Sequence, residues 1–461
     1  MTLAPFADTI AAISTPLGIG GIAVIRISGP DTVKIVKQVS SLNKPVPNQI
    51  RFTSFFSPDK NKIDEGLLSF FKGPFSFTGE DMAELNCHGG YVVAQKLIDT
   101  LLRLGARQAD KGEFTMRAFI NGKIDLMQAE SVIDLIEAKT EKASGIFVHQ
   151  LEGRLSKKIQ TIREQLLKLI SHLEVHLDYP EEEDLKKPSD YANIIKDLVS
   201  RIDHLLATYN TGRLLKEGIL TVIAGAPNVG KSSLLNALLK DNRAIVTDIP
   251  GTTRDTIEEW MQLEGIPFKF VDTAGLRNSQ NKIEIIGMGK TKKLINKADL
   301  VLLMLDAGRD LNKDDQAILK KLDPKKTVVI INKIDLPKNC SKKITELPSL
   351  KFFSSNIYQL SVKKRKGLTA LEKGLVKFAQ KNFLTASEQK DAIISNDRQK
   401  EQLISAKKTL SSALKSIKKG LSEDLWLIDL RLALSTLGSI IGEDISEEVL
   451  NDIFSRFCVG K

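Results

Sequence analysis

Cysteines, aromatic side chains and long apolar runs are all scarce in this sequence of 461 residues. Its three cysteines, Cys87, Cys340 and Cys458, are an odd number at wide and irregular spacing, which supports neither a disulfide framework nor a zinc site. Such cysteine usage favours a reducing compartment. The first 14 residues contain an acid and no basic stretch, which argues against a signal or transit peptide. We therefore expect a cytoplasmic protein.

No stretch approaches the roughly 20 uncharged apolar residues that a membrane-spanning helix needs. The nearest candidate, residues 426–442, contains Asp429 and Arg431 and is interpreted as a buried helix. We expect no membrane partner.

The overall composition, with 42% hydrophobic and 27% charged residues, is ordinary for a globular protein, and the length predicts about three domains. Basic residues exceed acidic ones and give a formal net charge of +10. A polyanion such as RNA would suit this excess, but many basic proteins bind no nucleic acid. Charge alone leaves RNA binding open.

The hydrophobic pattern of the first 120 residues is mixed. Residues 21–28 and 81–88 have the alternation and residue types of strands, and residues 91–104 have a helical spacing. This part is therefore predicted to be α+β.

Helical spacing dominates from residue 126, notably at 155–177, and again at 403–421. Between these stretches, residues 219–380 alternate between strands and helices. The simplest interpretation is one helical domain interrupted by an inserted α/β domain, because the two ends of a domain usually lie close together.

A phosphate-binding loop follows the first strand of the inserted domain. An apolar run at 219–224 leads directly into Gly225-Ala-Pro-Asn-Val-Gly-Lys-Ser232, and a helical stretch follows. This is the G-x-x-x-x-G-K-[ST] loop in the strand–loop–helix context that it requires, so a chance glycine-rich turn is a poor alternative. Lys231 should reach the β- and γ-phosphates, and the Ser232 hydroxyl should bind Mg²⁺. The expected GTP contacts are Asn228, Val229, Gly230, Lys231, Ser232 and Ser233.

A second motif, Asp272-Thr273-Ala274-Gly275, ends another predicted strand. Asp272 can hold Mg²⁺ through water, and the Gly275 N–H can sense the γ-phosphate. The next residue is Leu276, where Ras-type enzymes carry the glutamine that orients water. Another polar group must orient the water here, and a cation must offset the transition-state charge.

A third motif, Asn332-Lys333-Ile-Asp335, predicts guanine recognition. The Asp335 carboxylate can accept hydrogen bonds from the ring N–H and the exocyclic amine of guanine, a donor pair that adenine lacks. Asn332 should bond the other base edge and tie down the phosphate loop, while the Lys333 stem covers the ring. Ser361 belongs to a weaker final guanine motif, in which Val362 replaces the usual alanine.

The segment between the first two motifs is expected to close over GTP, with a threonine hydroxyl, that of Thr253, on Mg²⁺. The alternative is an ordinary Pro-Gly turn. The expected GTP contacts are Thr247, Asp248, Ile249, Pro250, Gly251, Thr252 and Thr253.

The sequence resembles the MnmE (TrmE) family of tRNA-modification GTPases, in the Era-like group, over the whole chain. Besides the GTPase motifs, the resemblance includes Glu84-Leu-Asn-Cys-His88-Gly-Gly90, Gly112-Glu-Phe-Thr-Met-Arg117-Ala-Phe-Ile-Asn121-Gly-Lys123, Asp178-Tyr-Pro-Glu181 and Phe457-Cys458-Val-Gly-Lys461. It implies a tetrahydrofolate-binding, dimerising α+β domain at 1–122 and a discontinuous helical domain at 123–216 and 384–461. The inserted P-loop G domain, with a mostly parallel sheet, would occupy 217–383.

The same resemblance implies that GTP hydrolysis depends on K⁺ and on pairing of G domains across a homodimer. Glu284 would orient the attacking water through a second water, although without the family it would be interpreted as a solvated acid at a helix start. The implied K⁺ ligands are Asn228, Thr247, Ile249 and Thr252, so that K⁺ supplies the charge that an arginine finger provides elsewhere.

The resemblance also implies folate contacts at Arg26, Glu84, Lys123 and Lys461. Basic partners suit the glutamate carboxylates of a folate, and Glu84 could accept donors from the pterin ring. Cys458 is a candidate nucleophile, because nearby cations would favour its thiolate, but simple packing at a helix end is an equal alternative.

Our leading hypothesis is a cytosolic homodimer that forms a heterotetramer with an FAD- and NADH-dependent partner of the MnmG type. Together they would add a carboxymethylaminomethyl or aminomethyl group at carbon 5 of the wobble uridine in tRNA. One alternative is a ribosome-assembly GTPase that acts as an RNA-binding switch, and another is a folate enzyme regulated by its G domain. The ribosome-assembly alternative is weakened because residues after 383 carry neither a second Lys-Ser loop nor a basic G-x-x-G.

Overall fold

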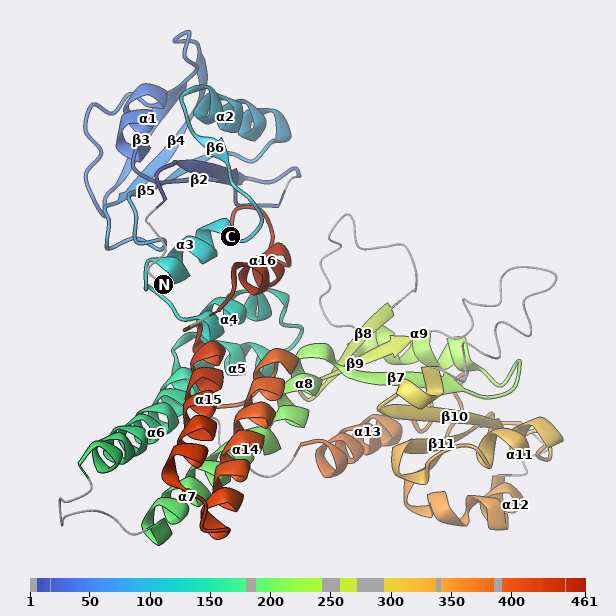
Figure 1. Cartoon of the computed structure of the whole chain (residues 1–461). Helices are drawn as coiled ribbons and strands as arrows, with labels where there is room; N and C mark the ends of the chain where they lie inside the picture. The colour runs from blue at the N-terminus through green and yellow to red at the C-terminus, as the bar shows by residue number, and fades with distance from the viewer. Residues whose placement is uncertain are drawn as a thin grey trace, which may run out of the picture. The chain divides into compact units, whose positions relative to one another are not determined.

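The structure is a computed structural model of the whole chain (Figure 1). It describes residues 6–16, 18–179, 188–242, 258–271, 294–336, 341–384, 392–443 and 445–461. The chain forms two compact units, which are described separately. One unit comprises Met1–Ile133, Gln150–Val199 and Gln402–Lys461, and the other comprises Asp134–His149 and Ser200–Glu401.

The first unit contains a six-stranded sheet in the order β3-β4-β5-β2-β1-β6. Its strands are antiparallel except for the pair β1–β6. The strands are β1 (Ile10–Ile13), β2 (Ile22–Ser28), β3 (Ile50–Phe56), β4 (Lys62–Phe71), β5 (Met82–His88) and β6 (Arg107–Gln108). The predicted strands at 21–28 and 81–88 are confirmed as β2 and β5.

Apolar and polar side chains alternate along β2, so one face of this sheet is apolar and the other is polar. Ala23, Ile25 and Ile27 are buried in a core formed with helices α1 (Thr32–Val39) and α2 (Tyr91–Arg103). Because successive side chains of a strand point to opposite faces, Arg26 and Ser28 lie on the other face. That polar face carries Arg26 and its register partner Glu84, for both of which folate contacts are expected. The helix predicted at 91–104 is confirmed as α2.

Helices make up the rest of the first unit. Here α6 (Arg154–Asp178) packs along α15 (Glu423–Ile441), and Trp426 on α15 is fully buried with its ring 5.9 Å from that of Tyr191. Helix α16 (Glu447–Ser455) packs on α3 (Glu113–Ile120), and its Phe454 shares a core with Leu126 at the start of α4 (Leu126–Glu137). The long helices predicted at 155–177 and 403–421 are confirmed as α6 and α14 (Asp397–Lys418). Most of α7 (Pro188–Ala207) also belongs to this unit, whereas most of α5 (Glu141–Leu151) belongs to the second.

The second unit contains a six-stranded sheet in the order β12-β11-β10-β7-β9-β8, parallel except for the pair β8–β9. Its central strands are buried on both faces, as the apolar runs predict. This confirms the mostly parallel G-domain sheet. The strands are β7 (Ile219–Ala224), β8 (Glu258–Leu263), β9 (Ile266–Val271), β10 (Leu300–Asp306), β11 (Thr327–Asn332) and β12 (Ile357–Gln359).

Helices cover both faces of this second sheet. Apolar side chains of α8 (Tyr209–Glu217), α9 (Lys231–Asn242) and α13 (Leu368–Asn382) share one core with it. Those of α11 (Lys313–Leu319), α12 (Ser341–Thr345) and the 3-10 helix Pro348–Asn356 share the other. The 3-10 helix Pro324–Lys326 precedes β11. Across the residues that the structure describes, no helix is long and apolar enough to cross a membrane.

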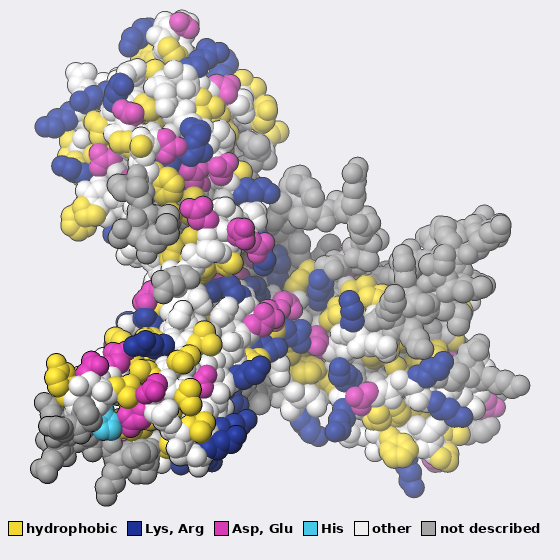
Figure 2. All heavy atoms as spheres, in the orientation of Figure 1, with side chains coloured by type: hydrophobic (Ala, Val, Ile, Leu, Met, Phe, Trp, Pro, Cys, Tyr) yellow, Lys and Arg dark blue, Asp and Glu magenta, His cyan; other side chains and the backbone are white. Residues whose placement is uncertain are grey.

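The surface carries charges of both signs. Figure 2 shows Lys and Arg side chains on the visible face of each unit, interspersed with Asp and Glu side chains. Basic and acidic side chains are therefore mixed over this face.

Candidate functional site

The phosphate loop lies between β7 and α9, at the carboxyl edge of the parallel sheet, and two of its glycines pack against neighbouring strands. A Cβ on Gly225 (φ +143°) would lie 2.4 Å from the Met304 carbonyl oxygen, and one on Gly230 (φ +104°) 2.6 Å from Asn332 Nδ2. No other residue fits at these positions without displacing β10 or the Asn332 side chain. The loop therefore has the close backbone packing that a phosphate cradle needs.

Lys231 begins α9 and lies over the loop. Its Nζ donates to the carbonyl oxygens of Gly225 (3.0 Å) and Ala226 (2.8 Å). Asn228, for which a K⁺ contact is expected, has a left-handed backbone (φ +63°). Ser232 and Ser233 follow in the first turn of α9, where N–H groups and the helix dipole favour an anion. The residues present thus fit a Mg²⁺-bound triphosphate.

Asn332, at the end of β11, links the phosphate loop to the guanine motifs. Its Nδ2 donates to the Val229 carbonyl oxygen at 2.8 Å, and its Oδ1 accepts from the Val362 N–H at 3.1 Å. Asn332 is 3% exposed, so both bonds are shielded from water. The contact of Val362 is made by its backbone, which explains how valine can replace the usual alanine.

Asp335 and Ser361 also meet in this region. The Ser361 hydroxyl donates to the Asp335 carboxylate, and this bond, with the charges of Lys364 and Lys363, holds the pKa of Asp335 below its ordinary value. The carboxylate is therefore ionised at neutral pH and can accept the guanine donors. Lys333 is held in place by an ion pair with Asp306, at 2.7 Å.

Several predicted GTP-site residues lie outside the described residues. They include the catalytic candidate Glu284, the segment Thr247, Asp248, Ile249, Pro250, Gly251, Thr252 and Thr253, and the motif Asp272, Thr273, Ala274 and Gly275. The described part of β9 ends at Val271, immediately before Asp272.

Three of the four residues with expected folate contacts lie together on the polar face of the first sheet. Arg26 and Glu84 are partners in the β2–β5 register and form an ion pair of 2.8 Å. Arg26 Nη1 also donates to the Gly460 carbonyl oxygen at 3.4 Å. Burial and the neighbouring Arg26 charge lower the pKa of Lys461. Two cations and a carboxylate meet here, a set that suits a ligand with both carboxylates and ring donors.

The fourth residue, Lys123, follows α3, and its Nζ donates to the Pro74 carbonyl oxygen at 2.8 Å. Cys458 is exposed, and its carbonyl oxygen accepts from the Gly112 N–H at 3.3 Å. Cys87 is buried instead, and burial raises the pKa of its thiol to about 11, which makes it unreactive.

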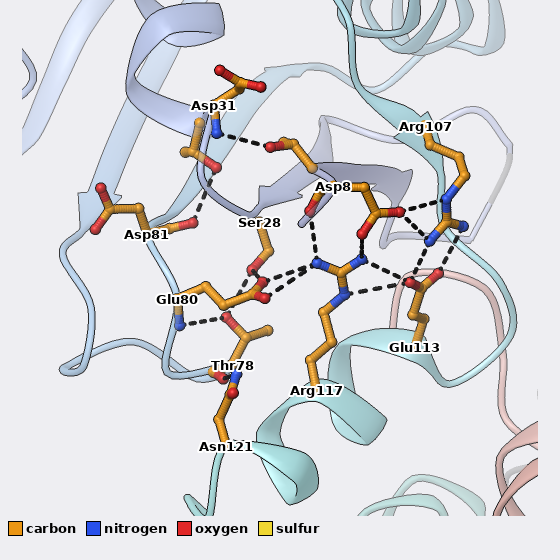
Figure 3. Close-up of polar contacts among 12 residues, drawn as sticks. Asp8, Ser28, Asp31, Thr78, Glu80, Asp81, Arg107, Glu113, Arg117 and Asn121 are labelled. Carbon is orange, nitrogen blue, oxygen red and sulfur yellow. Dashed lines mark hydrogen bonds and ion pairs between the residues drawn. The ribbon is translucent and has the colours of Figure 1, made fainter. Parts of the chain in front are cut away.

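Sequence reasoning missed a buried ion cluster beside this polar face. Arg117 on α3, fully buried, pairs with Asp8 (2.7 Å), Glu80 (3.2 Å) and Glu113 (2.9 Å), as Figure 3 shows. Arg107 adds a second cation to Glu113 at 2.6 Å. The signal in the sequence was an arginine within the otherwise uncharged run Phe114-Thr-Met-Arg-Ala-Phe119.

The α/β fold, the phosphate loop and the guanine motifs define the class of the protein as a P-loop GTPase. Two family models match the chain: "MnmE helical domain" at residues 126–458 and "GTP-binding protein TrmE N-terminus" at residues 9–123. The chain belongs to the MnmE family.

Curated relatives named "tRNA modification GTPase MnmE" match the chain over nearly its whole length. That of Thermoanaerobacter pseudethanolicus is 44% identical, with 98% of this chain and 99% of the relative covered. That of Carboxydothermus hydrogenoformans is 45% identical, with the same coverage. Among solved structures, the G domain of the T. maritima FeoB iron transporter is 27% identical over 35% of this chain and 99% of its own, with a TM-score of 0.25.

Proposed function

We propose that the chain is the GTPase of a tRNA-modifying assembly that adds a carboxymethylaminomethyl or aminomethyl group at carbon 5 of the wobble uridine. The observation that carries the proposal is the presence of two sites in one chain. One is a guanine-nucleotide site, with Asp335 fixed by Ser361, and the other is the polar cluster of Arg26, Glu84 and Lys461. The name of the relatives, tRNA modification GTPase, supports tRNA as the substrate.

In the guanine site each described side chain has a distinct role. The Asp335 carboxylate accepts from the base, Asn332 sets the distance between the base and the phosphate loop, and Lys231 exchanges its loop carbonyls for phosphate oxygens. Ser232 and Thr253 would hold Mg²⁺. Bound Mg²⁺ and K⁺ supply positive charge against the phosphates.

For K⁺, the proposed ligands are Asn228, Thr247, Ile249 and Thr252, and the residue that orients the attacking water is Glu284. Leu276 cannot orient water, so another polar group is required for that task. Pairing of two G domains across a homodimer would complete the site.

In the polar cluster we propose that a tetrahydrofolate carries the one-carbon unit. Arg26, Lys123 and Lys461 would attract its carboxylates, and Glu84 would accept pterin donors. Cys458 belongs to the same C-terminal segment and is exposed, so it is open to a role in the chemistry. An FAD-dependent partner of the MnmG type would supply the redox step within a heterotetramer, and the net charge of +10 would favour tRNA phosphates.

The hydrolytic part of this proposal is tested by GTP turnover in KCl and in NaCl, for the wild type and for Glu284→Ala. We expect turnover to require K⁺ and to fall by roughly a hundredfold or more in the variant, as for loss of a group that orients water. Glu346→Ala, at an exposed position just after α12, is the matched control and should keep full turnover. Equal rates in the two salts would refute the role of K⁺, and a fully active Glu284→Ala protein would remove Glu284 from the mechanism.

A further inference from the structure

Helix α3 connects segments that carry the proposed folate residues. At its start, the Gly112 N–H donates to the Cys458 carbonyl oxygen, and a Cβ on Gly112 would lie 2.9 Å from Phe457 Cβ. At its end, the chain turns at Gly122 (φ +69°) into Lys123. The position of α3 therefore affects both the C-terminal segment with Lys461 and the placement of Lys123.

Arg117 anchors the middle of α3 to two other segments. Its Nη1 donates to Glu80 at 3.2 Å and to the Asp8 carbonyl oxygen at 3.0 Å, and its Nη2 bonds the Asp8 carboxylate at 2.7 Å. The Phe6 ring lies 4.3 Å from the guanidinium carbon. Figure 3 shows these carboxylates arranged around the planar guanidinium from different directions. Such a fork fixes orientation as well as distance.

Net stability is a weak explanation for this buried arginine. Removing two or more charges from water is expensive, and well-packed apolar side chains often serve stability equally well. What a buried ion cluster supplies in addition is a defined geometry. The relevant geometry here is the contact of α3 with the turn at residues 73–81.

Hydrogen bonds link Glu80 to the segments that carry the folate residues, on one side to β2 and on the other, through Ser28, to the end of α3. Toward β2, its Oε2 accepts from the Ser28 hydroxyl at 2.8 Å, and Ser28 lies two residues from Arg26 on the same face. Toward α3, the Ser28 hydroxyl meets the Thr78 hydroxyl at 2.7 Å, and the Thr78 carbonyl oxygen accepts from Asn121 Nδ2 at 2.7 Å.

The same turn sets the position of Lys123. A Cβ on Gly79 (φ +81°) would lie 3.3 Å from Lys123 Cγ, so the lysine stem lies directly over this glycine. The Lys123 ammonium then reaches the Pro74 carbonyl oxygen. If the turn moved relative to α3, Lys123 would lose both its support and its hydrogen bond.

We propose that Arg117 is a positioning residue for folate binding: by clamping Glu80, it holds the 73–81 turn and α3 in the arrangement that places Lys123 and the face carrying Arg26. This inference rests on the proposed folate function. It assigns a role to a side chain that does not itself touch the ligand.

The test measures the affinity of the full-length protein for 5-formyltetrahydrofolate by calorimetry. In Arg117→Met, Glu80 loses its cation, whereas Asp8 and Glu113 keep Arg107 among the described residues. We expect the affinity near pH 8 to fall on the order of tenfold. Arg103→Met, at an exposed position on α2, is the matched control and should bind as the wild type does.

A second substitution separates positioning by the Arg117–Glu80 ion pair from general support of the fold. The charged groups around the vacated position are Asp8, Glu80, Arg107, Asp110 and Glu113. Glu80→Gln removes the other charge of the same ion pair, so it should weaken folate binding by a similar factor. Combined with Arg117→Met, Glu80→Gln should cost little more affinity than either change alone, because both substitutions break the same contact.

Wild-type affinity in Arg117→Met would overturn the inference. So would wild-type affinity in Glu80→Gln, or a double variant whose deficit equals the product of the two single deficits. If Arg117→Met does not fold, Arg117→Lys keeps the charge without the fork and should bind several-fold more weakly than the wild type. Wild-type affinity in that variant would also overturn the inference. A wild-type protein that binds no folate would instead refute the folate function, and this inference with it.

Discussion

Replacing Asp335 with asparagine should convert the nucleotide preference from guanine toward xanthine. The change keeps the shape of the side chain, and its remaining carbonyl oxygen can still accept from the Ser361 hydroxyl, so the local structure should survive. What changes is the partner of the base. The two charge-assisted hydrogen bonds that guanine donates to the carboxylate are lost. In addition, the NH₂ group of the new amide faces the N–H groups of guanine, so that donor lies against donor.

The structure allows the size of this effect to be estimated. Losing one hydrogen bond to a charged group typically costs about tenfold in affinity, so losing two of them, partly replaced by weaker contacts, should cost roughly a hundredfold. Xanthine has an oxygen where guanine has its exocyclic amine, and that oxygen can accept from the amide group that the substitution introduces.

The assay is calorimetric titration of wild type and Asp335→Asn with GTP and with XTP. Asp59→Asn, at an exposed position outside the G domain, is the control and should leave both affinities unchanged. An Asp335→Asn protein that still preferred GTP by the wild-type margin would refute the assignment of Asp335 to the base.

The remaining predictions concern three positions. Gly230→Ala should weaken GTP binding by about tenfold or more, because Gly230 has a left-handed backbone and a Cβ there would lie 2.6 Å from Asn332 Nδ2. Gly145→Ala is the control, because Gly145 in α5 has open space around it, and it should bind GTP as the wild type does. Equal GTP affinity in the two variants would contradict the close packing of the phosphate loop. Asn332→Ala should leave the Val229 carbonyl and the Val362 N–H unpaired, which costs about 1–3 kcal/mol of stability each, and so lower the melting temperature of the nucleotide-free protein. An unchanged melting curve would contradict the structural role of these two hydrogen bonds. Because burial and Arg26 lower the pKa of Lys461, its charge is lost at a lower pH than that of an ordinary lysine, and folate affinity should weaken as pH rises through that lowered pKa. Lys461→Arg, which keeps its charge, should remove this alkaline weakening, and the same pH profile in both proteins would contradict the role of Lys461.

The sequence predicted those parts of the molecule that depend on local pattern. The strand–loop–helix context of residues 219–239 and the alternation in β2 and β5 each involve neighbours in the chain, so periodicity and motif spacing were sufficient. The left-handed backbone at Gly225 and Gly230 follows from the same motif, because the loop must approach β10 and β11 closely.

Contacts between distant residues could not be predicted in this way. Arg26 and Gly460 are 434 positions apart, and Arg117 and Asp8 are 109 apart. Nothing in their local sequence specifies these partners, because each pairing arises only when α3, the sheet and the C-terminal segment have packed together. The family resemblance singled out Arg26 and Lys461 but gave Arg117 no role.

Modification of tRNA is the central claim, and nucleoside mass spectrometry tests it most directly. The tRNA would come from a strain that lacks this gene, with and without complementation by the wild-type chain. We predict loss of the carbon-5 modification of the wobble uridine in the deletion strain and its return on complementation. An unchanged nucleoside profile in a strain without a second copy would contradict the account and favour a ribosome-assembly GTPase.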